Sequence, residues 1–480
     1  MSDFNLIPLL PEIFLALIGM GLLMVGVFQG NNAMRVVSWA SVAGLAISAL
    51  ILLAIGWETR SVLNSMFVID EFSGFMKMLI IIGLIASLTL STRYLIQEGM
   101  ERIEFPILVI FAGIGMMIMV SANNLLALYM GLELQSLALY VLAAFQRNSV
   151  RSSEAGIKYF VLGALSSGML LFGISLIYGF TGSIDFGVIA QTLSSLESIP
   201  FGVTFGLVFI LAALAFKISA VPFHMWTPDV YQGAPSAVTA LFAMVPKIAA
   251  FGLLMRLLFE PFDALADQWI QIIYFISLMS MLLGAFAGIA QTNIKRLLAY
   301  SSIGNMGYAL IGLVAGTAAG AGAVILYLMI YMIMTAGVFA VVLTMRRQGL
   351  AVYKISDLNG LSRTAPGIAY GMAILMFSMS GIPPAAGFFG KLAVFNAAVS
   401  EGYIVLAVLG VLTSVVAAYY YLRVIKAMFF DEPADAFDKD IPFCRRAVLA
   451  IAVLFVLGFI IKPSVFIESS LTAASALFTG

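Results

Sequence analysis

Four charged residues lie deep inside apolar runs of this 480-residue chain, and their types could carry proton chemistry. They are Glu133, Lys217, Lys247 and Lys391. A charged side chain at the centre of a bilayer costs roughly 2.5–3.5 kcal/mol on insertion scales, so such residues are functional candidates. Lysine and glutamate can exchange protons, and a nearby carboxylate stabilises the charged form of a buried lysine. If the apolar runs lie in lipid, these residues predict a proton pathway.

The pair of Glu133 and Lys217 shows how such a pathway could switch. If the two side chains came within ~4 Å, their attraction would be about 4 kcal/mol at an effective dielectric constant near 20. Making and breaking this contact would move the lysine between holding and releasing a proton. The sequence contains both residues but does not place them together.

Two of the lysines adjoin interruptions of their helices. The segment Gly367–Val399 would run about 50 Å as one helix at ~1.5 Å per residue, which is too long for a single straight span. The motif SGIPPAAG interrupts it before Lys391, because proline lacks a backbone donor. The motif SAVP interrupts the earlier segment just after Lys217. Discontinuous helices at membrane depth are tolerated where they line a polar cavity.

The two lysines are mirrored about these breaks. Lys217 ends a half-helix, where the dipole favours a cation, whereas Lys391 lies near the start of one, where the dipole opposes it. We therefore expect Lys391 to release its proton more easily. Paired breaks mark inverted repeats and the ion site in transporters; two unrelated proline kinks are the alternative.

The composition places the chain in a membrane. Hydrophobic residues make up 62% and charged residues 10%, against about 25% charged residues in soluble domains. Apolar runs of about 20 residues recur throughout, each long enough for a helical span, whereas barrel strands would be shorter and alternate in polarity. The sequence predicts an all-α polytopic protein, one membrane domain over residues 1–480 with about 14 transmembrane helices. We expect spans near Pro8–Phe28, Arg35–Gly56, Phe72–Thr92, Glu104–Ser121, Leu125–Phe145, Glu154–Phe180, Gly202–Val230, Ser236–Phe259, Trp269–Ala290, Ile294–Ala315, Ala321–Met345, Gly367–Val399, Gly402–Phe430 and Arg446–Ile461.

The distribution of basic residues predicts the orientation. Most lysines and arginines fall in one set of alternate loops, while the opposite set offers only Arg60 and Lys462. Loops rich in lysine and arginine stay inside. With an even number of spans, both termini are expected on the outer, periplasmic side. The N-terminus has no basic segment before its apolar run, so we expect a retained first span and not a cleaved signal peptide.

The residues that are scarce restrict the chemistry. One cysteine, Cys444, cannot hold an iron–sulfur cluster, and one histidine, His224, cannot form a bis-histidine haem site. The chain contains neither GxGxxG nor GxxxxGK[ST], the nucleotide-binding motifs. Its net charge is zero, which gives no support to nucleic-acid binding. We therefore expect no catalytic redox centre, no cofactor-binding site and no metal site in this chain.

Other charged residues have a simpler explanation. Lys77, Lys158, Arg256 and Arg423 lie near the ends of predicted spans. Long basic side chains at such positions can extend to the membrane interface. This explanation is least convincing for Lys158.

Three stretches connect the sequence to a known family. They are FKISAVPFHMWTPDVYQGAPSAVTAL, QTNIKRLLAYSSIGNMGY and AGFFGKLAVF, in this order. Together they resemble the subunit N family of proton-pumping NADH:quinone oxidoreductase, respiratory complex I, whose mitochondrial counterpart is NADH dehydrogenase subunit two. The resemblance covers essentially the whole chain. WTPDVYQGAP is the discriminating stretch, because sister subunits L and M and the multisubunit cation/proton antiporters resemble HxWLPxA there.

The resemblance implies an architecture and a pathway. The family has 14 transmembrane helices and two inverted repeats, each with a discontinuous helix, which we place at residues 104–260 and 269–430. By motif match, Glu133 and Lys217 form the first pair of a proton path, Lys247 continues it and Lys391 leads toward the exit. Secondary candidates are Lys158, His224, Lys295 and Tyr300.

Two of the secondary candidates have structural alternatives. Lys295 and its neighbour Arg296 could instead anchor the inner membrane surface. His224 could simply cap or pack beside the broken helix.

The resemblance also implies a division of labour. NADH, FMN, the iron–sulfur clusters and quinone would belong to partner subunits, and this chain would hold no cofactor while moving protons outward. Expected partners are subunit M, the lateral helix of subunit L and membrane lipid. This chain lacks such a lateral helix after its last span, which agrees with subunit N. The expected location is the bacterial cytoplasmic membrane, with the mitochondrial inner membrane as the less favoured choice.

Two other functions remain open at this stage. A subunit of a multisubunit cation/proton antiporter would share the lysines and the broken helices. A structural membrane scaffold is disfavoured, because four central charges would be costly without a function.

Overall fold

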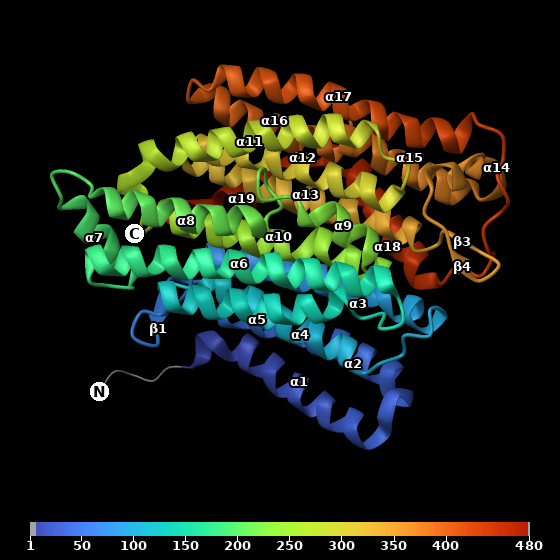
Figure 1. Cartoon of the computed structure of the whole chain (residues 1–480), viewed down its shortest axis with the longest axis horizontal. Helices are drawn as coiled ribbons and strands as arrows, with labels where there is room; N and C mark the ends of the chain where they lie inside the picture. Colours follow the sequence, from blue (N-terminus) through green and yellow to red (C-terminus); the bar gives the residue numbers. More distant parts are fainter. Residues whose placement is uncertain (1–5, 479–480) are drawn as a thin grey trace.

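Long helices packed side by side build the protein (Figure 1). The structure, a computed structural model, describes residues 6–478. Within that part, 11 helical stretches are long and apolar enough to cross a membrane. The first of them contains two helices, α1 (Leu10–Gln29) and α2 (Met34–Ile55), which turn at Gly30 with a φ of 67°.

The remaining long helices follow the predicted spans closely. Two of them, α4 and α10, have the predicted bounds, and the others differ by a few residues at their ends. They are α3 (Glu71–Gln97), α4 (Glu104–Ser121), α5 (Leu125–Ala143), α6 (Val150–Thr181), α10 (Ser236–Phe259), α11 (Ala266–Ile289), α12 (Ile294–Val314), α13 (Ala318–Val342), α17 (Ile404–Phe429) and α18 (Phe443–Gly458).

Short polar side chains fix several helix starts. The Asp70 carboxylate accepts from the Ser73 backbone N–H at 2.7 Å at the start of α3. Asn124 caps α5 and Asn293 caps α12 in the same way. Each satisfies backbone donors that have no partner within the helix, so the polar residues between apolar runs define where these helices begin.

Two helices are interrupted where the sequence predicts breaks. The half-helices are α8 (Phe201–Lys217), α9 (Trp226–Gly233), α15 (Pro366–Ser380) and α16 (Ala386–Ser400). Ser219 follows α8 with a φ of 65°, and Gly381 follows α15 with a φ of 85°. Neither conformation continues a right-handed helix, so each apolar run is divided and both expected discontinuities are confirmed.

Several short elements were not expected from the sequence. The helix α19 packs on α13 and α3, while α7 and the hairpin of β1 and β2 lie at one end of the bundle, opposite β3, β4 and α14 (Figure 1). The short helices are α7 (Phe186–Ser194), α14 (Leu361–Thr364) and α19 (Pro463–Ser475). The strands are β1 (Arg60–Val62), β2 (Phe67–Ile69), β3 (Arg346–Arg347) and β4 (Leu350–Ala351), paired antiparallel as β1–β2 and β3–β4.

The core of the bundle is formed by three helices. Every residue of α10 is buried, and nearly every residue of α12 and α13 is buried too. Glycines let neighbouring helices approach closely: a Cβ added at Gly284 of α11 would lie 2.5 Å from the backbone nitrogen of Gly304 in α12. A Cβ added at Gly115 of α4 would lie 2.6 Å from the Gly131 carbonyl oxygen of α5. Small residues commonly permit such contacts in membranes.

Two cations that the sequence placed at the interface are buried in ion pairs instead. The ammonium of Lys77 lies 2.7 Å from a carboxylate oxygen of Glu12, and both side chains are almost fully buried. Arg256 donates to both carboxylate oxygens of Asp70, at 2.9 and 2.8 Å. Arg256 also donates to Glu260, four residues further along the chain, at 2.5 Å. The interface expectation is wrong for both residues, because Glu12 and Asp70 lie on distant parts of the chain and were not visible as neighbours in the sequence.

Arg423 and Lys158, the other two basic residues expected at the membrane interface, differ in their burial and contacts. Arg423 is half-buried and donates to the carbonyl of Ile289 at 2.7 Å, so it caps the end of α11 and does not simply extend to the interface. The side chain of Lys158 remains 40% exposed.

The predicted orientation can be tested at opposite ends of the bundle. Leu350, in the hairpin of β3 and β4, is 73% exposed, and Ser198, between α7 and α8, is also exposed. In a Cys444→Ser background, we expect Leu350→Cys to resist an impermeant thiol reagent in intact cells and Ser198→Cys to react. The reverse labelling pattern would show that the assigned orientation is inverted.

Candidate proton pathway

Lys217 lies at the break between α8 and α9. It is the last residue of α8 and is only 6% exposed. Its Nζ donates to the Ser136 hydroxyl at 2.7 Å and to the Tyr140 hydroxyl at 3.4 Å, both on α5. The C-terminal end of a helix also favours a cation. The ammonium is therefore held by two neutral hydroxyls of α5.

Glu133 lies one turn before Ser136 on α5 and has a different partner. Its Oε1 accepts a short hydrogen bond from the Ser167 hydroxyl of α6. Within residues 6–478, no ion pair joins Glu133 to Lys217, so the direct pairing implied by the resemblance is absent from this structure. Serine hydroxyls satisfy each charge separately. Since a hydroxyl both donates and accepts, Ser136 and Ser167 can take part in passing a proton.

Lys247 lies at the centre of the bundle, directly after Pro246 in α10. Its Nζ donates a short hydrogen bond to the Ser302 hydroxyl of α12. The same oxygen accepts from the Tyr331 hydroxyl of α13 at 2.7 Å. The ring of Tyr231 lies 5.7 Å from the ammonium. All three core helices thus meet at this lysine.

Lys391 lies early in α16, but its ammonium reaches the end of α15. It donates to the carbonyls of Met379 and Ser380 at 3.1 and 3.0 Å, and to the Ser414 hydroxyl of α17 at 2.7 Å. The expectation of an opposing dipole is wrong, because the charge sits at the C-terminal end of the preceding half-helix. The helix positions of Lys217 and Lys391 therefore do not favour proton release from Lys391 over Lys217.

A polar cluster lies between Lys247 and Lys391. The hydroxyls of Ser301 and Tyr421 are 2.6 Å apart. Asn305 donates to Tyr421 at 3.2 Å and accepts from the Tyr327 hydroxyl at 2.7 Å. Ser301 directly precedes Ser302, the partner of Lys247. This cluster extends the polar axis along α12 toward α17.

Aromatic side chains separate Lys217 from Lys247. Tyr159 stacks on Trp226 with ring centroids 4.5 Å apart, and Trp226 approaches Tyr231 at 6.4 Å. In the described part of the chain, no continuous series of hydrogen bonds between side chains leads from Lys217 to Lys247. The axis therefore consists of hydrogen-bonded segments around each lysine, with an aromatic barrier between the first two.

The secondary candidates have different outcomes. Lys295 is buried and donates to the Ala234 carbonyl at the end of α9 at 2.6 Å, so it does not anchor the surface. His224 is half-buried in the loop between α8 and α9. Tyr300 is half-buried on α12, and among residues 6–478 its hydroxyl has no hydrogen-bond partner. Neither His224 nor Tyr300 contacts the four principal residues through a hydrogen bond.

Asp229 is a polar residue that the sequence analysis overlooked. Its carboxylate accepts from Lys158 at 2.8 Å and from Arg296 at 2.7 Å. Lys158 also pairs with Glu154 at 2.7 Å. A cavity of about 210 Å³ borders Asp229, Lys158 and Glu154. The signal was present, because Asp229 is the acidic residue inside WTPDVYQGAP.

Most of the hydroxyl partners were also overlooked. Nothing in the sequence singles out Ser136, Ser302 and Ser414, because one serine within an apolar span is common. Their role depends on which lysine faces them from another helix, which requires the fold. In the described residues, no group of three histidine, cysteine, aspartate or glutamate side chains is arranged to hold a metal ion.

Comparisons with known proteins place this geometry in a family. Residues 122–417 match the family model described as NADH:quinone oxidoreductase/Mrp antiporter, TM. NADH-quinone oxidoreductase subunit N of Parvibaculum lavamentivorans is 54% identical over 98% of this chain and 97% of its own length. The subunit N of Rhodospirillum rubrum shows the same identity and coverage. The chain belongs to the subunit N family. The resemblance inferred from the three stretches is confirmed.

Solved structures agree with this assignment. A chain of respiratory complex I from Thermus thermophilus with bound aureothin has a TM-score of 0.81 at 31% identity, with 95% of this chain and 98% of that chain covered. A chain of the Mrp complex from Dietzia sp. has a TM-score of 0.85 at 24% identity, covering 98% of this chain and 97% of that chain. The second likeness shows a shared fold.

The hydroxyl that holds Lys217 gives a direct test of the subunit N site. We expect Ser136→Ala to lower NADH:quinone reductase activity about tenfold, because an unmet buried donor costs roughly 1–3 kcal/mol. The matched control is Ser41→Ala, a buried serine on α2 that bonds only to the Val37 carbonyl, and it should retain activity. Equal activities for the two variants would contradict a role for Ser136.

Proposed function

We propose that this chain translocates protons across the bacterial cytoplasmic membrane as a membrane-arm subunit of NADH:quinone oxidoreductase. The observation that carries the proposal is the set of buried lysines, each bound to a hydroxyl on another helix. A lysine whose partner is a neutral hydroxyl can lose its proton without breaking an ion pair. Because the chain belongs to the subunit N family, the reaction coupled to proton movement would be the oxidation of NADH by quinone.

The proposed architecture has 14 spans. This number counts α1 and α2 separately and treats each broken pair of half-helices as one span. Two inverted repeats, residues 104–260 and 269–430, fit the order of the helices, because each contains a broken helix with a buried lysine beside the break. Both repeats also begin with two helices that cross at glycines. The basic loops would face inside, which places both termini outside.

The proposed proton movement follows the polar contacts. The protonation state of Glu133 would determine whether Lys217 keeps or releases its proton. A released proton would pass through the hydroxyls of Ser136 and Ser167. The aromatic barrier would separate this step from Lys247, which exchanges protons through Ser302. Lys391, beside Ser414, would complete the route. If the aromatic barrier opened at only one stage of the reaction cycle, protons would move in one direction.

The proposed division of labour assigns the redox chemistry to other subunits. NADH, FMN, the iron–sulfur clusters and quinone would lie in partner subunits, and this chain would carry none of them. Neighbouring membrane-arm subunits, including subunit M and the lateral helix of subunit L, are the proposed protein partners. Membrane lipid would surround the exposed apolar helix faces.

A subunit of a cation/proton antiporter is the second candidate function. The observation that favours it is the shared fold with the Mrp complex chain. The subunit N relatives are about twice as similar in sequence, which supports the first proposal. Impaired cation tolerance without any effect on NADH oxidation would favour the antiporter.

The proposal predicts a joint loss of activity and pumping. We expect Lys217→Ala and Glu133→Ala each to lower quinone reductase activity and proton pumping by at least about tenfold, as for lost proton-transfer groups. NADH oxidation with an artificial acceptor that takes electrons upstream of quinone should stay near the wild-type rate and show that the complex assembles. Because the two residues act as one unit, the double variant should be little worse than the worse single variant.

Several results would argue against this account. Full quinone reductase activity and full pumping in Lys217→Ala would remove the lysine from the mechanism. Loss of the artificial-acceptor activity in membranes would indicate a scaffold role, because assembly would then have failed. The exposed lysine Lys426 offers a control, and Lys426→Ala should leave every readout unchanged.

A further inference from the structure

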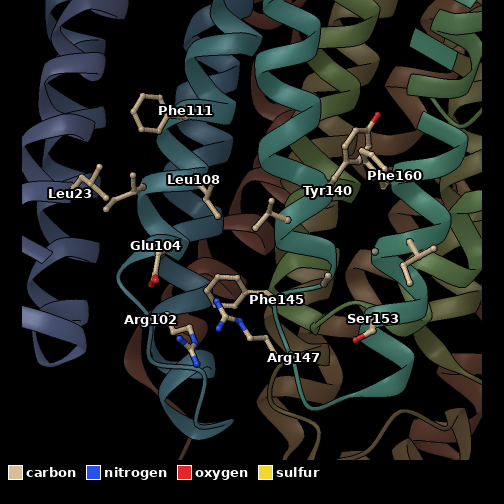
Figure 2. A pocket seen from close by; sticks show the side chains of 15 residues that line it. Leu23, Arg102, Glu104, Leu108, Phe111, Tyr140, Phe145, Arg147, Ser153 and Phe160 are labelled. Atoms are coloured by element: carbon tan, nitrogen blue, oxygen red, sulfur yellow. The ribbon is translucent and has the colours of Figure 1, made fainter. Parts of the chain in front are cut away.

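An apolar groove opens between α1, α4, α5 and α6 (Figure 2). Its volume is about 770 Å³. Leu23 of α1 faces it from one side, Leu108 and Phe111 of α4 form its floor, and Phe160 of α6 lies on the other side. None of the four principal residues of the proton pathway lines this groove. An apolar groove of this volume is large enough for a hydrocarbon chain.

One end of the groove is charged. Arg102 and Arg147 lie there together, beside Glu104 and Ser153 (Figure 2). In the described part of the chain, neither arginine forms an ion pair or a side-chain hydrogen bond, and neither does Glu104. Two guanidinium groups and one carboxylate leave a net charge of about +1 at this end. The groove therefore joins an unpaired basic end to an apolar channel.

The dimensions match one leaflet of a bilayer. From Glu104 to Phe111, α4 rises about 10 Å at ~1.5 Å per residue. One leaflet contributes about 15 Å of hydrocarbon depth. The charged end belongs to the loops that the distribution of basic residues assigns to the inner surface. An amphipathic ligand of the inner leaflet would place its polar group and its chain in the positions that the groove provides.

We propose that this groove binds one anionic phospholipid, with its phosphodiester between Arg102 and Arg147 and an acyl chain along Leu108 and Phe160. A single negative charge neutralises the net positive charge of the charged end, which a zwitterionic headgroup would not do. Basic pockets between transmembrane helices on the cytoplasmic side are known to hold anionic headgroups. An apolar helix of a partner protein would leave both guanidinium groups without a partner.

The groove also meets the first segment of the polar axis. The ring of Tyr140 lines it (Figure 2), and the hydroxyl of the same residue accepts from Lys217 at 3.4 Å. A bound acyl chain would cover Tyr140 from the bilayer side. The lipid would thereby hold Tyr140 against Lys217 and keep other molecules away from the segment.

Photocrosslinking of the purified assembly tests the proposal. The assembly is placed in phosphatidylcholine nanodiscs that contain phosphatidylglycerol with a photoreactive group on its acyl chain, and labelled peptides are identified by mass spectrometry. We expect labelling of α4, α5 and α6 that unlabelled phosphatidylglycerol removes and added phosphatidylcholine does not. Equal labelling by the corresponding phosphatidylcholine probe would overturn the preference for an anionic lipid.

Matched variants locate the binding site. Each basic residue near an anionic headgroup favours binding roughly fivefold, so Arg102→Gln with Arg147→Gln should lower labelling about 25-fold. Arg363 is exposed in the short helix α14, outside the groove, and Arg363→Gln should leave labelling unchanged. Unchanged labelling in the double variant would refute the site. Artificial-acceptor NADH oxidation shows whether each variant assembles.

A second variant keeps the test decisive if the double variant fails to assemble. Val141 lines the groove and is 55% exposed, so Val141→Trp fills the space and leaves both arginines in place. We expect labelling to disappear in this variant. Persistent labelling would contradict the proposal. Crosslinking of a Val141→Cys variant to another subunit in the native membrane would also contradict it, because a protein would then occupy the groove.

Discussion

A buried ammonium that changes its protonation state must be satisfied without a permanent counter-charge, and the bundle is arranged to meet this constraint at three lysines. Lys217, Lys247 and Lys391 each find a serine hydroxyl on a neighbouring helix. Lys77 shows the other solution, a buried pair with Glu12. An ion pair favours the charged lysine strongly, whereas a hydroxyl can accept from an ammonium or donate to a neutral amine. The three axial lysines are thus suited to changing protonation state, and Lys77 is suited to holding helices together.

The broken helices are a consequence of the same constraint. A continuous helix uses its own carbonyls, and only its last turn leaves acceptors free. Ending α15 inside the bundle provides the Met379 and Ser380 carbonyls for Lys391. Ending α9 provides the Ala234 carbonyl for Lys295. The break after α15 therefore places helix carbonyls, with their partial negative charge, next to Lys391. The end of α9, just before α10, does the same for Lys295.

Much of this architecture could be predicted from the sequence, since apolar runs and proline motifs are local signals. The bounds of α4 and α10, both breaks and the four central charges follow from them. The partners could not be predicted, because they depend on contacts between distant segments. Glu133 bonds to Ser167 and Lys217 bonds to Ser136, and the two do not bond to each other. Asp229 joins Lys158 to Arg296. The direction of the Lys391 side chain also reversed the expectation drawn from its position in α16.

The central claim is that the lysines on the core axis carry protons, and Lys247 is the most direct place to test it. The measurement is the number of protons pumped per NADH oxidised by the purified assembly in liposomes that contain Lys247→Ala. The account predicts that this ratio falls together with the rate of quinone reduction, while artificial-acceptor NADH oxidation is kept. An unchanged ratio at an unchanged rate of quinone reduction would contradict it.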